Sequence, residues 1–180
     1  MGISPKLAEL NEERFQTWKA PFTTSNAKQS LLAFKGDVYT DIETDKFSDE
    51  DFEFAQDHLR ILSGLYGVLR PLDRMFPYRL EMGTKLATKR GKSLYDFWGT
   101  TIAETLKADM EGHRDQTIMN LASNEYFKSV DKKTLGAPVL EAKFLNVKDG
   151  KARNLMYYAK FGRGLMTRWI MQERVDRADG

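Results

Sequence analysis

The segment from Leu59 to Arg79, LRILSGLYGVLRPLDRMFPYR, constrains the fold of this chain more than any other. Gly64 and Gly67 lie three positions apart in an otherwise apolar run. Glycine lets a turn present its backbone N–H groups without a covering side chain, which suits a phosphate or another oxyanion. Pro71 fits the first turn of a following helix, where its missing N–H costs nothing. The pattern therefore predicts a helix, a tight hairpin and a short second helix.

This order outlines a helix-hairpin-helix, which grips a nucleic-acid backbone through turn amides rather than by reading bases. A plain helix-to-helix turn that uses its glycines as C-caps is also consistent with the residues. The glycine spacing is one residue wider than is usual for a helix-hairpin-helix, and Pro77 limits the second helix to little more than one turn. In the first interpretation, the hairpin residues that contact a phosphate are Gly64, Leu65, Tyr66 and Gly67.

Acidic and basic residues are segregated along the chain, although the net charge is only +2. Between Asp41 and Asp57 there are eight acids and one lysine, whereas seven bases and two acids lie between Arg70 and Lys92. Such segregation can create a basic face that binds anions on a nearly neutral molecule. It is equally consistent with ordinary solvated surfaces that differ in sign. The bases that we expect to make electrostatic contacts with DNA are Arg70, Arg79, Lys92, Lys128, Lys160 and Arg163.

Local patterns predict several elements. Ser48, followed by three acids, begins a helix with two apolar stripes, which places His58 in the core. Residues 78–82 alternate as a strand does, and Ser93 begins a long helix whose apolar stripe reaches Leu106. Asp149-Gly150 predicts the turn of an antiparallel hairpin. A last helix over residues 160–174 places Phe161, Leu165, Met166, Trp169 and Ile170 on one apolar side.

A polar site is predicted where a short buried strand, Thr117 to Leu121, ends. Small and polar residues directly after a buried strand are where α/β proteins place ligands. Alternatively, Ser123 or Asn124 is only the N-cap of a short helix. The residues of this candidate polar pocket are Asn120, Ser123, Glu125 and Tyr126.

The chain has no cysteine, which excludes disulfides, thiolate metal ligands and a cysteine-based peroxidase mechanism. Its two histidines, His58 and His113, are far apart in the sequence and neither lies in a ligand-spaced cluster, so we expect no iron site, no other metal site and no cofactor. No apolar run reaches the length of a membrane span, and the N-terminus lacks the apolar core of a signal peptide. We therefore expect a cytoplasmic protein that does not bind membranes.

Six longer motifs occur along the chain: LLAFKGDVYT (Leu31–Thr40), FAQDHLRILSGLYGVLRPLD (Phe54–Asp73), PYRLEMG (Pro77–Gly83), LYDFW (Leu94–Trp98), NLASNEYFKSV (Asn120–Val130) and AKFGRGLMTRWI (Ala159–Ile170). In the same order, these motifs closely resemble the YaaA family of bacterial peroxide-stress proteins, and the match covers nearly all 180 residues. The resemblance implies a DNA-binding protein of mixed α/β fold with a helix-hairpin-helix, tied to survival of peroxide and to low free iron. The family's N-terminal strand region, with its Ser-Pro-Ala-Lys motif, and its C-terminal segment are absent, so we expect a domain incomplete at both ends.

Together these observations predict one compact α+β domain over residues 1–180, with helices, short strands, an antiparallel hairpin and a helix-hairpin-helix. We expect it to bind double-stranded or structured DNA, mainly through the backbone, and to help limit iron-dependent oxidative damage. The alternative is an enzyme that acts on a nucleotide or nucleic acid in the candidate polar pocket, although no nucleophile-base pair, P-loop or metal cluster is recognisable. A third interpretation is an interaction protein that uses the acidic stretch 41–57.

Overall fold

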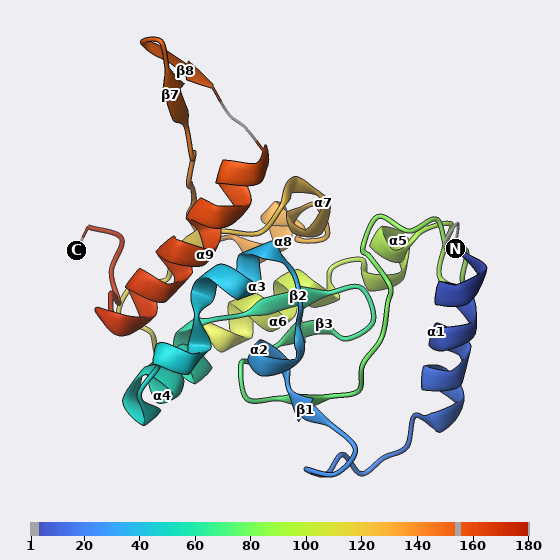
Figure 1. Ribbon diagram of the computed structural model, residues 1–180. Helices are drawn as coiled ribbons and strands as arrows, with labels where there is room; N and C mark the ends of the chain where they lie inside the picture. The colour runs from blue at the N-terminus through green and yellow to red at the C-terminus, as the bar shows by residue number, and fades with distance from the viewer. Residues whose placement is uncertain (1–3, 154–155, 180) are drawn as a thin grey trace.

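A computed structural model of the chain describes residues 4–153 and 156–179, in which helices and short strands follow one another (Figure 1). The elements up to residue 75 are α1 (Pro5–Thr17), β1 (Lys28–Gln29), α2 (Ser30–Ala33), α3 (Asp37–Ile42), a 3-10 turn (Thr44–Lys46), α4 (Asp49–His58), β2 (Ile61–Ser63), β3 (Gly67–Leu69) and β4 (Arg74–Met75). The later elements are α5 (Leu94–Trp98), α6 (Thr101–Asp109), β5 (Ile118–Asn120), α7 (Asn124–Phe127), α8 (Lys132–Leu135), β6 (Val139–Glu141), β7 (Asn146–Lys148), β8 (Lys151–Arg153) and α9 (Met156–Gln172). The predicted α+β class is confirmed.

The described strands pair into four two-stranded sheets. β1 pairs with β4, β2 with β3 and β7 with β8, all antiparallel, whereas β5 and β6 are parallel. The predicted hairpin turn is confirmed, because Asp149 and Gly150 adopt φ angles of 53° and 71° between β7 and β8. None of the described helices is long and apolar enough to cross a lipid bilayer.

The helix-hairpin-helix predicted across residues 59–79 is wrong, because strands follow its first helix. α4 ends at His58, and β2 and β3 then form an antiparallel hairpin with Ile61 opposite Leu69. Pro71 lies in a turn, after which the chain continues into β4 rather than into a helix. The reason is burial on two sides, since a strand sends successive side chains to opposite faces and both faces of this hairpin meet apolar residues.

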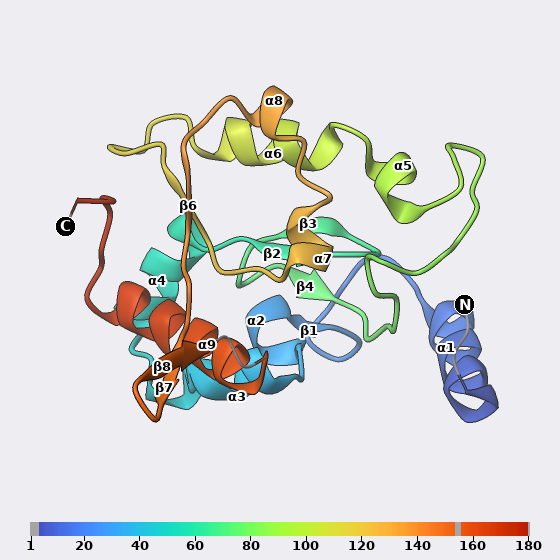
Figure 2. The same ribbon diagram turned by 90° about the horizontal axis from the view of Figure 1, so that it is seen from above.

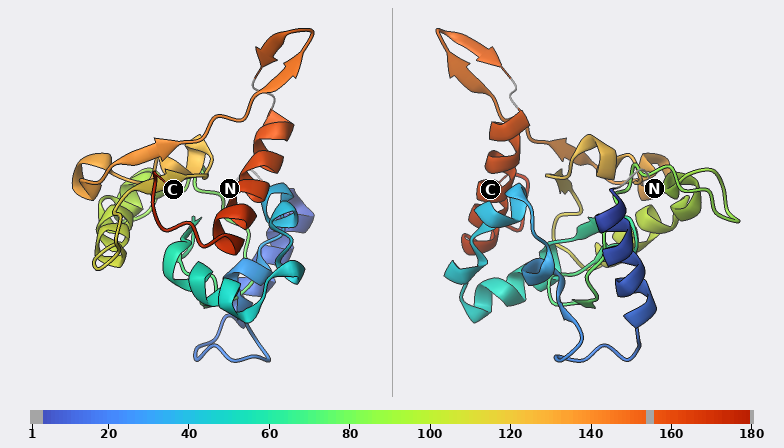
Figure 3. Two further views of the ribbon diagram at one scale, coloured as in Figure 1. Left: turned by 90° about the vertical axis from the view of Figure 1, so that its left-hand side faces the viewer. Right: turned by 45° about the vertical axis from the view of Figure 1, so that its right-hand side comes forward.

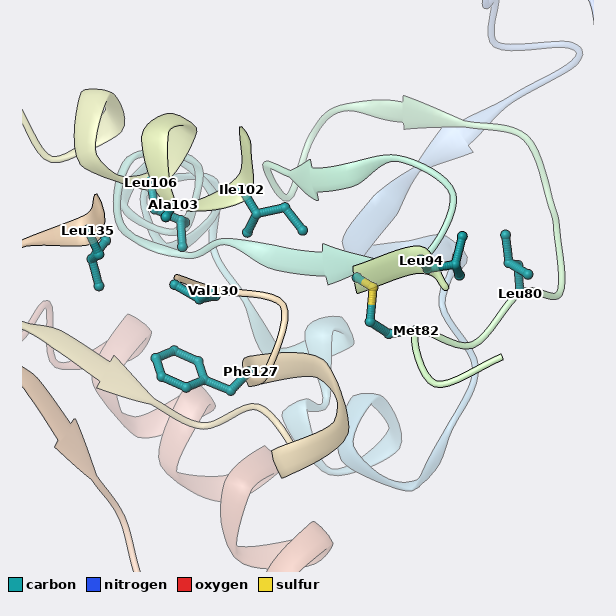
Figure 4. Packing of buried hydrophobic residues seen from close by; sticks show 9 residues of the cluster. All are labelled: Leu80, Met82, Leu94, Ile102, Ala103, Leu106, Phe127, Val130 and Leu135. Atoms are coloured by element: carbon teal, nitrogen blue, oxygen red, sulfur yellow. The ribbon is translucent and has the colours of Figure 1, made fainter. Parts of the chain in front are cut away.

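Two apolar clusters lie on the two faces of the β2–β3 hairpin. Leu62 and Val68 pack against the first cluster, whereas Ile61 and Leu69 belong to the second, together with three further buried residues. The hairpin is therefore the central element of the core. The buried residues of the first cluster are Leu80, Met82, Leu94, Ile102, Ala103, Leu106, Phe127, Val130 and Leu135 (Figure 4).

The start of α4 is as predicted, but its end is not. Ser48 and Asp51 form a capping box, in which the Asp51 N–H donates to Ser48 Oγ at 3.2 Å and the Ser48 N–H donates to Asp51 Oδ2 at 3.0 Å. His58, predicted in the core, is exposed, and its ring stacks on Phe54 with centroids 3.9 Å apart. The helix ends at His58 because the next residues are used as a strand.

The long helix predicted from Ser93 is divided into α5 and α6. Ser93 caps α5 as predicted, and Gly99 ends that helix with a φ of 50°, which favours glycine. The predicted apolar stripe is still buried, because Leu94, Ile102 and Leu106 all enter the first cluster. Residues 78–82 are not the predicted strand, since they pair with no other strand in the described part of the chain.

The predicted apolar side of the last helix is only partly buried. In α9, Phe161 and Trp169 are 42% and 50% exposed, whereas Thr167 is buried. α9 packs on α3, beside which it lies in Figure 2. The contact depends on Gly164, because a Cβ there would lie 2.5 Å from the carbonyl oxygen of Val38. Close approach of two helix backbones needs small residues at the contact, so the larger side chains of α9 lie elsewhere on the helix.

Candidate functional site in the central cavity

A cavity of about 1370 Å³, which we call the central cavity, is bounded by α1, α3, residues 75–81, the junction between β5 and α7, and α9. It brings together residues from two sites that the sequence predicts separately. Arg79, Lys160 and Arg163 from the predicted DNA contacts line it, and so do Asn120, Ser123 and Tyr126 from the candidate polar pocket. The predicted residues outside its lining are Gly64, Leu65, Tyr66, Gly67, Arg70, Lys92, Glu125 and Lys128.

The polar residues at the end of β5 and after it are held by local backbone contacts. Asn120 Oδ1 accepts the N–H of Ala122 at 3.0 Å, and Ser123 Oγ accepts the N–H of Tyr126 at 3.4 Å. Ser123 is therefore the N-cap of α7, which is the alternative that the sequence left open. Burial raises the pKa of the Tyr126 hydroxyl, so this group stays protonated and is able to donate a hydrogen bond.

Glu125 does not line the cavity, and it fastens a neighbouring loop. Its Oε1 accepts the N–H of Gly83 at 2.8 Å, and its backbone oxygen accepts the hydroxyl of Tyr95 at 2.9 Å. Lys128 lies with its Nζ 5.0 Å from the centroid of the same Tyr95 ring. These two predicted site residues therefore connect α7 to α5 and to the loop before it.

An aromatic wall of the central cavity was not predicted. Phe34 stacks on Tyr39 with centroids 5.1 Å apart and meets Tyr78 edge to face at 6.2 Å. The Tyr78 hydroxyl hydrogen bonds with Ser63 Oγ at 2.6 Å. Burial raises the pKa of both tyrosines, which keeps their hydroxyls neutral. No local sequence pattern identifies this wall, because Tyr78 lies far along the chain from Phe34 and Tyr39.

Cations outnumber anions on the wall of the central cavity, with eight lysines and arginines against six acids. Half of these bases are held in ion pairs, such as Lys160 Nζ with Asp37 Oδ2 at 2.9 Å and Arg79 with Glu81. The other half make no ion pair with any acid in the part of the chain that the structure describes: Arg14, Lys28, Lys35 and Arg163. The cavity therefore has a net positive wall.

Arg70, predicted to contact a phosphate, is already in an ion pair. Its Nη2 donates to Asp109 Oδ1 at 2.6 Å, while the Nε of Arg60 donates to the other carboxylate oxygen. Partial burial alone would raise the pKa of Asp109, but the hydrogen bonds from Arg70 and Arg60 outweigh burial and hold that pKa below its ordinary value. The pair joins the end of β3 to the end of α6.

The glycines of the β2–β3 turn are explained by packing. Gly64 has no room for a side chain because the backbone of Leu80 lies against it. Gly67 has a φ of 74°, and a Cβ there would lie 2.8 Å from the ring of Trp98. The indole N–H of Trp98 donates to the carbonyl oxygen of Gly64 at 3.1 Å. The turn joins two strands, so it is not the helix-to-helix turn that the sequence offered as the alternative to a phosphate grip.

The acids of the stretch 41–57 are partly used inside the protein. Glu43 pairs with Arg168 of α9, and Asp51 Oδ1 lies 3.4 Å from the Nη2 of Arg174. These pairs fasten the end of the chain to α3 and α4, which leaves a smaller acidic face than the sequence suggests.

The two histidines, which the sequence separates, are neighbours in the structure. His58 and His113 meet edge to face with ring centroids 4.8 Å apart, and both line the central cavity. Within the described ranges, no group of three or more histidines or acids is arranged to hold a metal ion.

The family model described as peroxide stress protein YaaA matches residues 1–180. The matched range includes all the residues of the aromatic wall, the positive wall and the end of β5. The chain therefore belongs to the YaaA family of peroxide stress proteins.

Proposed function

We propose that this protein binds double-stranded or structured DNA through phosphate contacts at the central cavity, and thereby helps to limit iron-dependent damage during peroxide stress. The observation that supports this most is the set of four cations on the cavity wall that lack a described ion-pair partner. A cavity whose wall has an excess of positive charge and apolar side chains focuses the electrostatic field on an incoming anion. Among the four, Arg163 is half-buried, so its charge is screened less than that of an exposed lysine.

The proposal is tested by titrating the protein with a short duplex of mixed sequence at several salt concentrations. Each phosphate neutralised on a duplex contributes about −0.9 to the slope of log K against log salt. The variant Lys35→Ala/Arg163→Ala should therefore reduce the magnitude of this slope by about 1.8. Lys6→Ala/Lys19→Ala, which removes two exposed cations outside the cavity, is the matched control. A slope near zero for the unaltered protein would contradict the proposal.

A second candidate function is an enzyme that acts on a nucleotide or a nucleic acid. It is favoured by one observation, that Asn120, Ser123 and Tyr126 line the same cavity as the aromatic wall. In this case free nucleotides should raise the thermal midpoint of the protein, and Asn120→Ala should abolish that increase. A nucleotide effect without duplex binding would favour the enzyme, and duplex binding without a nucleotide effect would favour the DNA-binding protein.

A further inference from the structure

The β7–β8 hairpin and the residues that lead into it project from the body of the protein (Figures 1 and 3). We call residues 143–153 the arm. Its stem is fixed to α9, because the ring of Phe144 lies against Gly162 and leaves no room for a side chain there. A two-stranded hairpin alone is marginally stable in water, so a projecting hairpin gains stability when a partner covers it. The stem thus gives the arm a defined direction, and its strands remain free to meet a partner.

The pairing of β7 with β8 gives the arm two chemically different faces. Val147 is opposite Ala152 and shares a face with Leu145, whereas Arg153 is opposite Asn146 and shares the other face with Lys151. Leu145 and Val147 are 55% and 68% exposed. One face of the arm is therefore apolar and solvent-exposed, and the other is cationic.

The charge of the arm indicates an anionic partner. Lys143, Lys151 and Arg153 are all exposed, and none makes an ion pair with an acid in the described residues. Asp149, at the turn, is the one acid in the arm's sequence. No described cation of the arm is therefore neutralised by the protein itself.

We propose that the arm is a second DNA-contacting element, which lies in a groove of duplex DNA with its cationic face on the phosphates. This inference rests on the proposed function. The major groove of duplex DNA admits a two-stranded β-ribbon. Lys151 and Arg153 are two residues apart along β8, which is about 6.8 Å, close to twice the axial spacing of about 3.4 Å between phosphates of one strand. Burial of Leu145 and Val147 against sugar and base edges removes their apolar surface from water.

Duplex titrations at several salt concentrations test whether the cationic face of the arm contacts phosphates. Lys151→Ala/Arg153→Ala should reduce the magnitude of the slope by about 1.8, and Lys143→Ala, in the stem outside the strand pairing, by about 0.9. The control Lys6→Ala/Lys19→Ala removes the same charge on the N-terminal side of the molecule, at and after α1, and should leave the slope unchanged. Duplex binding by the unaltered protein together with an unchanged slope in the arm variants would overturn this inference and leave the proposed function standing. Absence of duplex binding by the unaltered protein would overturn both.

The variant Leu145→Ser/Val147→Ser tests whether the apolar face of the arm contributes to duplex affinity. This variant should weaken duplex binding at every salt concentration by a constant factor, without altering the slope, because it removes no charge. Sedimentation of the free protein distinguishes a different occupant of that face. If the variant converts an oligomer of the free protein into monomers and leaves duplex affinity unchanged, the apolar face of the arm binds a second copy of the chain. The inference is then wrong.

Discussion

Asp109 is the residue whose replacement tests the packing of the core most directly. Its carboxylate accepts hydrogen bonds from Arg60 and Arg70, which joins the end of α6 to both ends of the β2–β3 hairpin. The side chain of Asp109 is 16% exposed, and those of Arg60 and Arg70 are 12% and 48% exposed. Asp109→Asn keeps the size of the side chain and removes its charge.

The exposed fractions of these side chains determine how much free energy of unfolding Asp109→Asn should remove. The hydrogen bond between Arg60 and Asp109 is nearly buried and involves charged groups, so it contributes about 1.5–3 kcal/mol. The Arg70 pair is half-exposed to solvent, which limits its contribution to about 0.2–1 kcal/mol. Asparagine retains one acceptor oxygen, so the free energy of unfolding should fall by about 2–3 kcal/mol. For a chain of this size the thermal midpoint should fall by about 4–12 °C.

Thermal unfolding followed by circular dichroism at several pH values measures this effect. The pKa of Asp109 is lowered in the folded state, so its stabilisation is present above the unfolded-state pKa of about 3.9 and is lost as the pH falls through the folded-state pKa. The midpoints of the two proteins should therefore differ at neutral pH and begin to converge as the pH falls below about 4. Asp45→Asn, at an exposed aspartate, is the matched control. Equal midpoints for Asp109→Asn and the unaltered protein at neutral pH would refute the reasoning.

Three further predictions concern the turn, a helix cap and iron. Gly67→Ala should lower the free energy of unfolding in urea by about 2–4 kcal/mol, because the φ of 74° strains alanine and the new Cβ meets the Trp98 ring; an unchanged urea midpoint would contradict this. Ser48→Ala should cost about 1 kcal/mol in the same assay through the lost cap of α4, and a variant as stable as the original would show that the cap is dispensable. The purified chain should not retain stoichiometric iron through desalting, since it has no cysteine and the described residues form no metal-binding group; retained iron that is lost in His58→Ala or His113→Ala would prove this wrong.

The features that the sequence determined are those that depend on neighbouring residues. Ser48 and Asp51 form a cap because a serine hydroxyl and an acid three residues later reach the first N–H groups of a helix. Asp149-Gly150 forms a turn because both residues tolerate a positive φ. The six family motifs are likewise local, and they were sufficient to identify the family that the comparison shows.

The tertiary structure alone decided which segments became strands and which residues share the central cavity. The run from Ile61 to Leu69 adopts a hairpin because apolar clusters bury its side chains on both faces. Those clusters come from distant parts of the chain. The orientation of α9 depends on the close contact of Gly164 with α3, which the apolar periodicity of the helix does not reveal. Arg163, Asn120 and Tyr39 line one cavity only because β5, α3 and α9 pack around it. Local patterns contain no information on these contacts, since each is a free-energy balance between segments far apart in the sequence.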